Sequence, residues 1–137
     1  MKKVFLSFAA EDMQKVKSLL TFLPNSNYEW DFYEGSLNMD FDSEEAILIK
    51  QLIGRKIVMC NLTVCLIGEN TYKSRWVDCQ LQKSRNKGNK IIAMALKGVK
   101  DVVLPQMIRE ENLTFYPWNP KKLIELINGS ILKKEGE

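Results

Sequence analysis

Histidine is missing from this sequence, and its absence removes the commonest enzymatic sites. Without one among the 137 residues, neither a Ser-His-Asp triad nor a Cys-His pair can form. Cysteine is scarce as well, because Cys60, Cys65 and Cys79 are odd in number and show no C-x-x-C spacing. This set predicts neither a disulfide framework nor a zinc site. We expect three reduced, buried thiols in a cytoplasmic protein, and catalysis by carboxylates, hydroxyls, thiols, amines or amides.

Long apolar runs and a strong charge imbalance are also lacking. No stretch of about 18 apolar residues occurs, so no transmembrane helix is predicted. The apolar stretch near the N-terminus breaks at Glu11, which favours a strand over a signal peptide. The net charge of +3 is too small to indicate a nucleic-acid partner. The length suits one compact domain, residues 1–137, and we expect the tail to fray from about residue 133.

Glycines form no phosphate-binding fingerprint. Neither G-x-G-x-x-G nor G-x-x-x-x-G-K-[ST] occurs, so no Rossmann or Walker nucleotide site is predicted. Glu11 and Asp12 follow the first predicted strand, like the magnesium-binding acids of response-regulator receivers, but Gly68 stands where the phosphoacceptor aspartate would be. We interpret the two acids as a helix start, where negative charge suits the helix dipole.

Apolar runs and helical patterns alternate about five times along the chain. The runs predict strands over residues 3–8, 28–34, 62–68, 90–96 and 113–118. Helical spacing predicts helices over residues 10–23, 42–59, 75–86 and 120–132. This alternation predicts an α/β fold, a flavodoxin-like three-layer sandwich with a five-stranded parallel sheet of order 2-1-3-4-5 and helices on both faces. The ligand site of such a sheet lies beyond the carboxyl ends of its strands.

Capping residues delimit two of the predicted helices. Asp42 is the predicted N-cap of the helix over 42–59, with Glu45 completing a capping box. Ser74 is the predicted N-cap of the helix over 75–86, which Gly88 would end. Trp76 and Gln80 stand four residues apart on one face of that helix. Spacing alone favours a tryptophan in the core and a glutamine on the surface.

Four stretches of the chain resemble a TIR domain, in particular the small TIR-like (ThsB-type) proteins of bacterial Thoeris anti-phage defence. They are KVFLSFAAED, FYEGSLNMDFDSEEAILIKQLIGRKI, LTVCLIGENTYKSRWVDCQLQKS and GNKIIAMAL, in the family's order over roughly residues 3–97. The resemblance implies an enzyme that cleaves the nicotinamide–ribose bond of NAD and makes a cyclic or conjugated ADP-ribose signal. NAD is then the substrate, and no cofactor or metal is implied.

The resemblance places a glutamine where the family has its catalytic glutamate. Ser74, Arg75 and Trp76 match the family's S-x-W motif, and the glutamate is expected four residues after the tryptophan, at Gln80. A carboxylate there would stabilise the positive charge that develops on the ribose as nicotinamide leaves. A neutral amide cannot, so we expect the chain as written to be nearly inactive. It is either a natural pseudoenzyme or an engineered Glu-to-Gln form, and the intact motif favours the latter.

The resemblance also implies a set of substrate contacts. In TIR enzymes the loops after the first two strands border the nucleotide, and the motif tryptophan flanks the ribose or nicotinamide. The positions carried over are Phe8, Ala9, Ala10, Asp12, Tyr33, Ser36, Leu37, Ser74 and Trp76. Simple core or surface packing is an equally open interpretation of Phe8 and Tyr33. Asp78 and Glu69 are acids near Gln80 in the sequence, but neither has the spacing to replace the glutamate.

Partners are implied by the resemblance as well. We expect NAD as substrate, self-association through TIR–TIR contacts, a phage-derived trigger, and an effector protein reached through the small-molecule product. No nucleic acid and no membrane are expected. Two other functions stay open, a non-catalytic TIR adaptor acting by protein–protein contact and a module that senses NAD or ADP-ribose without turnover. A glutamine at position 80 suits both.

Overall fold

One parallel sheet organises the chain in the computed structural model, which describes residues 2–23, 28–33 and 39–135, with side chains up to residue 130. Its five strands lie in the order β2-β1-β3-β4-β5, and every neighbouring pair is parallel. The strands are β1 Lys2–Ser7, β2 Tyr28–Asp31, β3 Leu62–Ile67, β4 Lys90–Ala95 and β5 Phe115–Tyr116. The predicted fold class and strand order are therefore confirmed.

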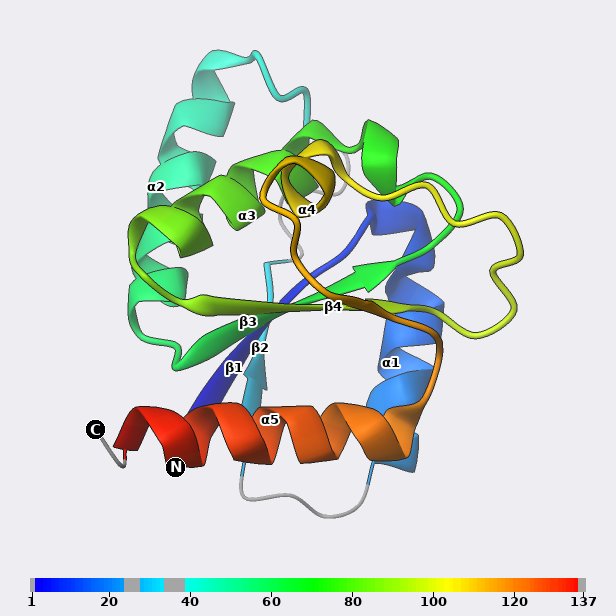
Figure 1. Ribbon diagram of the computed structural model, residues 1–137. Helices are drawn as coiled ribbons and strands as arrows, with labels where there is room; N and C mark the ends of the chain where they lie inside the picture. Colours follow the sequence, from blue (N-terminus) through cyan, green and yellow to red (C-terminus); the bar gives the residue numbers. More distant parts are fainter. Residues whose placement is uncertain (1, 24–27, 34–38, 136–137) are drawn as a thin grey trace.

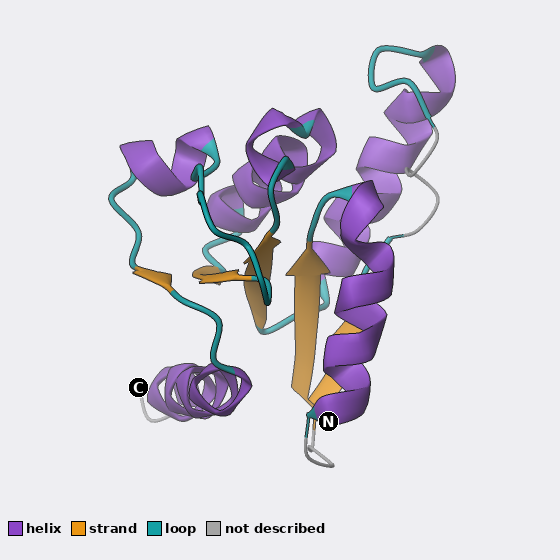
Figure 2. Cartoon of the chain, turned by 90° about the vertical axis from the view of Figure 1, so that its right-hand side faces the viewer, coloured by secondary structure: helices purple, strands orange, loops and turns teal. Residues whose placement is uncertain are grey.

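Helices cover both faces of the sheet, which gives the three predicted layers (Figure 1). On one face lie α1 Met13–Phe22 and α5 Pro120–Glu135. On the other lie α2 Glu44–Val58, α3 Arg75–Asn86 and α4 Gln106–Glu110. Figure 2 shows α1 standing beside the sheet, with α5 seen end-on. Two 3₁₀ turns, η1 Ala10–Asp12 and η2 Thr71–Lys73, follow β1 and β3 at the carboxyl edge of the sheet.

Alternation along β1 decides which side chains meet which helices. Val4 and Leu6 belong to the core that α1 and α5 cover. Phe5 points to the opposite face, where it packs with Ile53 and Ile57 of α2. Ser7, the last residue of β1, shares the face of Phe5 and is fully buried. The strand therefore delivers one hydroxyl to the helical layer that contains α3.

Most helix boundaries match the predictions, and the differences have local causes. The helix over 75–86 is as predicted, with the Val77 amide donating to Ser74 Oγ at 3.2 Å. The prediction that Asp42 caps the second helix is wrong. Ser43 caps α2, and Asp42 instead accepts a hydrogen bond from Arg75 at 2.6 Å.

Towards the C-terminus the predicted boundaries differ more. The strand over 113–118 shrinks to two residues, and α4 was not predicted. The last helix runs to Glu135 rather than to residue 132, and residues 136–137 lie outside the described part.

The side chain of Asp12 leaves no room for a Cβ atom at position 68, directly after β3, so a glycine is needed there. A Cβ built on Gly68 would lie 2.2 Å from Asp12 Oδ2, far inside van der Waals contact. Asp12 is itself only 5% exposed. The Gly68 amide donates to Thr71 Oγ1 at 2.7 Å, which fixes the turn after β3. The ends of β1 and β3 are therefore held together by close packing of a carboxyl group on bare backbone.

This packing predicts a coupled pair of substitutions. Gly68→Ala is expected to lower the free energy of unfolding by about 1–3 kcal/mol, because the added methyl group overpacks a buried site. In an Asp12→Ala background the same change should cost much less, since the carboxyl group that it strikes is gone. Urea unfolding of the four chains measures this, and an equal cost of Gly68→Ala in both backgrounds would refute the contact.

Candidate active site

A narrow pocket opens at the carboxyl ends of β1 and β2, where a parallel sheet of this order is expected to bind ligands. Its volume is about 80 Å³. The lining residues come from β1, from the segments that follow β1 and β2, and from α3 and its cap. They are Leu6, Phe8, Ala10, Phe32, Tyr33, Met39, Ser74, Trp76 and Gln80. The walls are mainly aromatic and apolar, a lining typical of sites for small organic ligands.

Gln80 lines this pocket and is buried, so it is not the surface amide that spacing alone favoured. The residue is only 5% exposed. Its Oε1 accepts a hydrogen bond of 2.6 Å from the hydroxyl of Ser7. Its backbone carbonyl accepts another from Ser84 Oγ, which in turn bonds Thr63 on β3. Gln80 is thus anchored to the sheet through both its side chain and its main chain.

The segment before α2 closes the pocket by folding onto α3. The indole of Trp76 donates to the carbonyl of Met39 at 3.2 Å and meets the ring of Phe41 edge-on, with centroids 4.9 Å apart. Lys50 and Arg75 lie over the Phe41 ring at 3.7 and 4.3 Å from its centroid. These contacts give Trp76 two roles, one as a pocket wall and one as the anchor of residues 39–41.

The structure brings most of the predicted site residues together. Phe8, Ala10, Tyr33, Ser74, Trp76 and Gln80 all line the pocket. Ala9 is buried and Asp12 lies beneath Gly68, and neither contributes to the lining. Ser36 and Leu37 lie outside the described residues.

Sequence reasoning missed four residues of this site, Leu6, Ser7, Phe32 and Met39. Ser7 had a readable signal, a polar residue ending an apolar strand on the face that meets the helices.

The pocket carries no charge on any described lining residue. Asp78, on the other side of α3, lines a separate groove with Gln106 and Glu110 of α4. Glu69 is exposed and is likewise absent from the lining. Neither acid therefore lies where it could replace a carboxylate at position 80, which agrees with their spacing in the sequence. A glutamate at position 80 would therefore be the one charged group among these lining residues.

Two further grooves, both wider than this pocket, adjoin α1 and β4. The larger, about 600 Å³, lies between α1 and the start of α5, and Leu19, Phe22 and Trp118 contribute its apolar lining. It contains none of the residues singled out from the sequence. The other, about 410 Å³, adjoins β4 and contains none of the predicted site residues. The narrow pocket is the one where the predicted residues converge.

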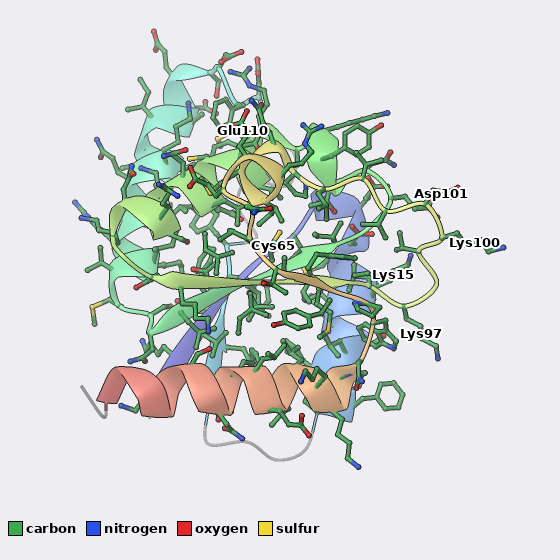
Figure 3. All side chains as sticks on the ribbon, in the orientation of Figure 1. Lys15, Cys65, Lys97, Lys100, Asp101 and Glu110 are labelled. Carbon is green, nitrogen blue, oxygen red and sulfur yellow. The ribbon has the colours of Figure 1, made fainter. Side chains whose placement is uncertain are left out.

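The cysteines take no part in the pocket. Cys60 and Cys65 are buried, as predicted, and burial raises the pKa of their thiols to about 11 and about 12. Figure 3 shows Cys65 in the interior beside the sheet. Cys79 is partly exposed, so the prediction of a buried thiol is wrong there. Among the described residues, no three Cys, Asp or Glu side chains gather as metal ligands would, and no helix has the length and apolarity to cross a membrane.

Solved structures with this fold define the class. The TIR domain of the Toll-related receptor TRR-2 from Hydra magnipapillata is similar with a TM-score of 0.60 and 18% identity, over 98% of each chain. Clostridium botulinum CMP N-glycosidase BcmB is similar with a TM-score of 0.60 and 19% identity, over 93% of this chain and 99% of that one. The fold is that of a TIR domain.

Sequence comparison narrows the class to one family. The model of the TIR-like domain of Thoeris protein ThsB matches residues 5–101, which include Gln80, so this chain belongs to that family. A Bacillus cereus (strain MSX-D12) protein named "Putative cyclic ADP-D-ribose synthase ThsB1" is 36% identical over 69 residues. The match covers 50% of this chain and 36% of the relative's length.

Among the described residues, Asp12 is the one buried carboxyl group at this edge of the sheet, and its electrostatics yield a prediction. Its Oδ2 has no hydrogen-bond partner within that part of the chain. Burial raises the pKa of Asp12, the neighbouring Glu11 and Glu69 raise it further, and Lys15 opposes them. The folded state therefore favours the protonated form, and stability is lost as the pH rises through the raised pKa.

Asp12→Asn should remove this pH dependence. The free energy of unfolding of the variant, relative to the parent chain, is expected to increase as the pH rises from about 4 upward, because only the parent must ionise a buried group. Urea unfolding across this range provides the measurement. Asp101→Asn, the same substitution at an exposed loop position, is the matched control. A difference that decreases with pH for Asp12→Asn would contradict the assignment.

Proposed function

We propose that the pocket binds the nicotinamide-riboside end of NAD, and that residue 80 is the position from which the nicotinamide–ribose bond is cleaved. One observation carries the proposal: Gln80 is a buried residue in the lining of an aromatic-walled pocket that has no charged residue among its described lining residues. Glutamine and glutamate have nearly the same shape. The site therefore has the form of a carboxylate site with its charge removed.

The chemistry of N-glycosidic cleavage explains what the missing charge would do. As neutral nicotinamide leaves, positive charge develops on the ribose, as in glycoside cleavage. A carboxylate beside the ribose stabilises that charge, and a water-poor pocket strengthens the interaction. Gln80 can still donate to a ribose hydroxyl through its amide, but it supplies no negative charge. In this proposal the chain as written binds NAD and turns it over very slowly.

The dimensions of the pocket fit one end of the substrate. A volume of about 80 Å³ suits contact with the nicotinamide-riboside end and is too small for a whole dinucleotide. Trp76, Phe8 and Tyr33 offer flat walls for nicotinamide or ribose. The remainder of NAD would then lie outside the pocket. NAD is the substrate, and the proposal requires no cofactor or metal.

The relatives support a signalling role. Making cyclic ADP-ribose, as in the name of the Bacillus cereus relative, requires the same cleavage when NAD is the starting material. We propose that the product, a cyclic or conjugated ADP-ribose, activates a separate effector in cytoplasmic anti-phage defence. A phage-derived trigger and self-association of TIR domains belong to the same proposal, as family properties.

A second candidate function is a non-catalytic adaptor, and the outer side of α2 favours it. Ile47 and Leu48 are 59% and 57% exposed, and Val58 and Met59 are 53% and 66% exposed. The two pairs lie about three helical turns apart, on the same side of the helix. Exposed apolar pairs of this kind suit a protein partner. Gln80 as the natural residue would agree with such a role.

Placing a carboxylate at position 80 distinguishes the enzymatic function from the adaptor function. Gln80→Glu is expected to raise the rate of nicotinamide release from NAD about 10²–10³-fold over the parent chain, because it supplies the missing transition-state charge. Incubation with NAD, followed by mass spectrometry of the products, gives the rate and also distinguishes cyclic, conjugated and hydrolysed ADP-ribose.

Gln82→Glu is the matched control for this gain. It adds the same charge two residues along α3, at an exposed position outside the pocket, and should leave NAD intact. If Gln80→Glu releases no more nicotinamide than Gln82→Glu, even with a phage lysate present to supply a trigger, the enzymatic proposal fails and the adaptor is the better account.

A further inference from the structure

The contact between Ser7 and Gln80 does more than fill space. Ser7 ends β1 and is 0% exposed, and its hydroxyl donates to Gln80 Oε1 at 2.6 Å across a separation of 73 residues. No other described group is placed to bond either the Ser7 hydroxyl or the terminal amide of Gln80. Each side chain is therefore the sole described partner of the other at this point.

This pairing selects one orientation of the Gln80 amide. With Oε1 towards Ser7, the serine proton is used, and the Nε2 group is left on the side of the pocket, where a ligand can meet it. With the amide turned over, Nε2 would donate to Ser7, and the proton of the fully buried serine hydroxyl would have no described partner. The observed orientation leaves fewer buried groups unsatisfied.

The main chain at residue 80 is fixed independently of its side chain. Ser84 Oγ donates to the Gln80 carbonyl at 2.9 Å and bonds Thr63 Oγ1 at 2.7 Å, which ties this turn of α3 to β3. Ser84 therefore holds the backbone from which the side chain starts, while Ser7 holds the terminal group. The two serines offer a matched comparison, because both are fully buried hydroxyl groups of the same size.

We infer that Ser7 is a positioning residue for side chain 80, and that it decides which terminal atom of that side chain faces the pocket. In the chain as written the atom is Nε2, so the pocket presents an N–H donor and suits ligand groups that accept hydrogen bonds, such as a ribose hydroxyl or an amide carbonyl. With glutamate at position 80, Ser7 would hold one carboxylate oxygen and leave the other facing the ribose. This second consequence rests on the proposed function.

The first test uses the chain as it stands and needs no catalysis. The order parameter of the Gln80 side-chain amide, from ¹⁵N relaxation, is expected to be that of a fixed group in the parent and to fall below about 0.6 in Ser7→Ala. Ser84→Ala removes an equivalent buried hydroxyl but not the contact with the amide, so it should leave the Gln80 order parameter near the parent value. An equal order parameter in parent and Ser7→Ala would overturn the inference.

The second test uses Gln80→Glu as the background. A hydroxyl that donates to a carboxylate favours its charged form, so adding Ser7→Ala should raise the pKa of the introduced carboxyl group by about one unit, measured by its ¹³C titration. Nicotinamide release should fall about tenfold in kcat with a smaller change in KM, and the acidic limb of its pH profile should move upward with the pKa. Ser7→Cys, a weaker donor, should lie between the two.

The two proposals fail in different ways. If Gln80→Glu does not cleave NAD but the order parameter and the titration of the introduced carboxyl group respond to Ser7→Ala, the proposed function fails and the positioning role stands. If Gln80→Glu cleaves NAD and Ser7→Ala changes neither the titration nor the pH profile, the function stands and the positioning role is refuted. Ser84→Ala in the same background shows whether a general loss of packing produces the same effects.

Discussion

The site depends on the hydrogen bond that Ser7 at the end of β1 donates to Gln80 on α3. It connects two elements that are far apart in the sequence, and it lies where the carboxyl ends of the strands leave room above the sheet. Because both partners are buried, the bond is shielded from water and its geometry is enforced by the packing around it. The pocket walls and the contact of Trp76 with Met39 all lie around this fixed point.

The fold could be predicted from the sequence almost completely, because its signals are local. Apolar strands alternate with amphipathic helices, and Ser74 caps α3 where its side chain can reach the Val77 amide. The predictions failed where tertiary contacts outweigh local preference. Asp42 has the chemistry of a helix cap, yet Arg75 engages its carboxylate and Ser43 caps the helix instead. The last strand retains only two residues, because only those reach the edge of β4.

The site could be predicted less completely, and spacing was not what located it. An i,i+4 pair placed Gln80 on the surface, whereas the TIR resemblance placed it in a site, and the structure buries it. Ser7 was not predicted, since its one signal, a polar residue at the end of an apolar strand, does not reveal which side chain it contacts. The TIR resemblance implied that Asp12 contacts the substrate. In the structure its side chain packs against the backbone of Gly68, outside the pocket lining. What the described pocket lining lacks is charge, and that absence follows from the single amide at residue 80.

The claim that this pocket is the NAD site is tested most directly by a crystal structure of the chain, with Gln80 as it stands, grown with NAD. The proposed slow turnover makes this chain the suitable one, because the intact dinucleotide should then persist. The account predicts the nicotinamide-riboside end between Trp76 and Phe8, with a ribose hydroxyl or the nicotinamide carbonyl within about 3 Å of Gln80 Nε2. NAD bound instead in the groove between α1 and α5, or an empty pocket at saturating NAD, would contradict it.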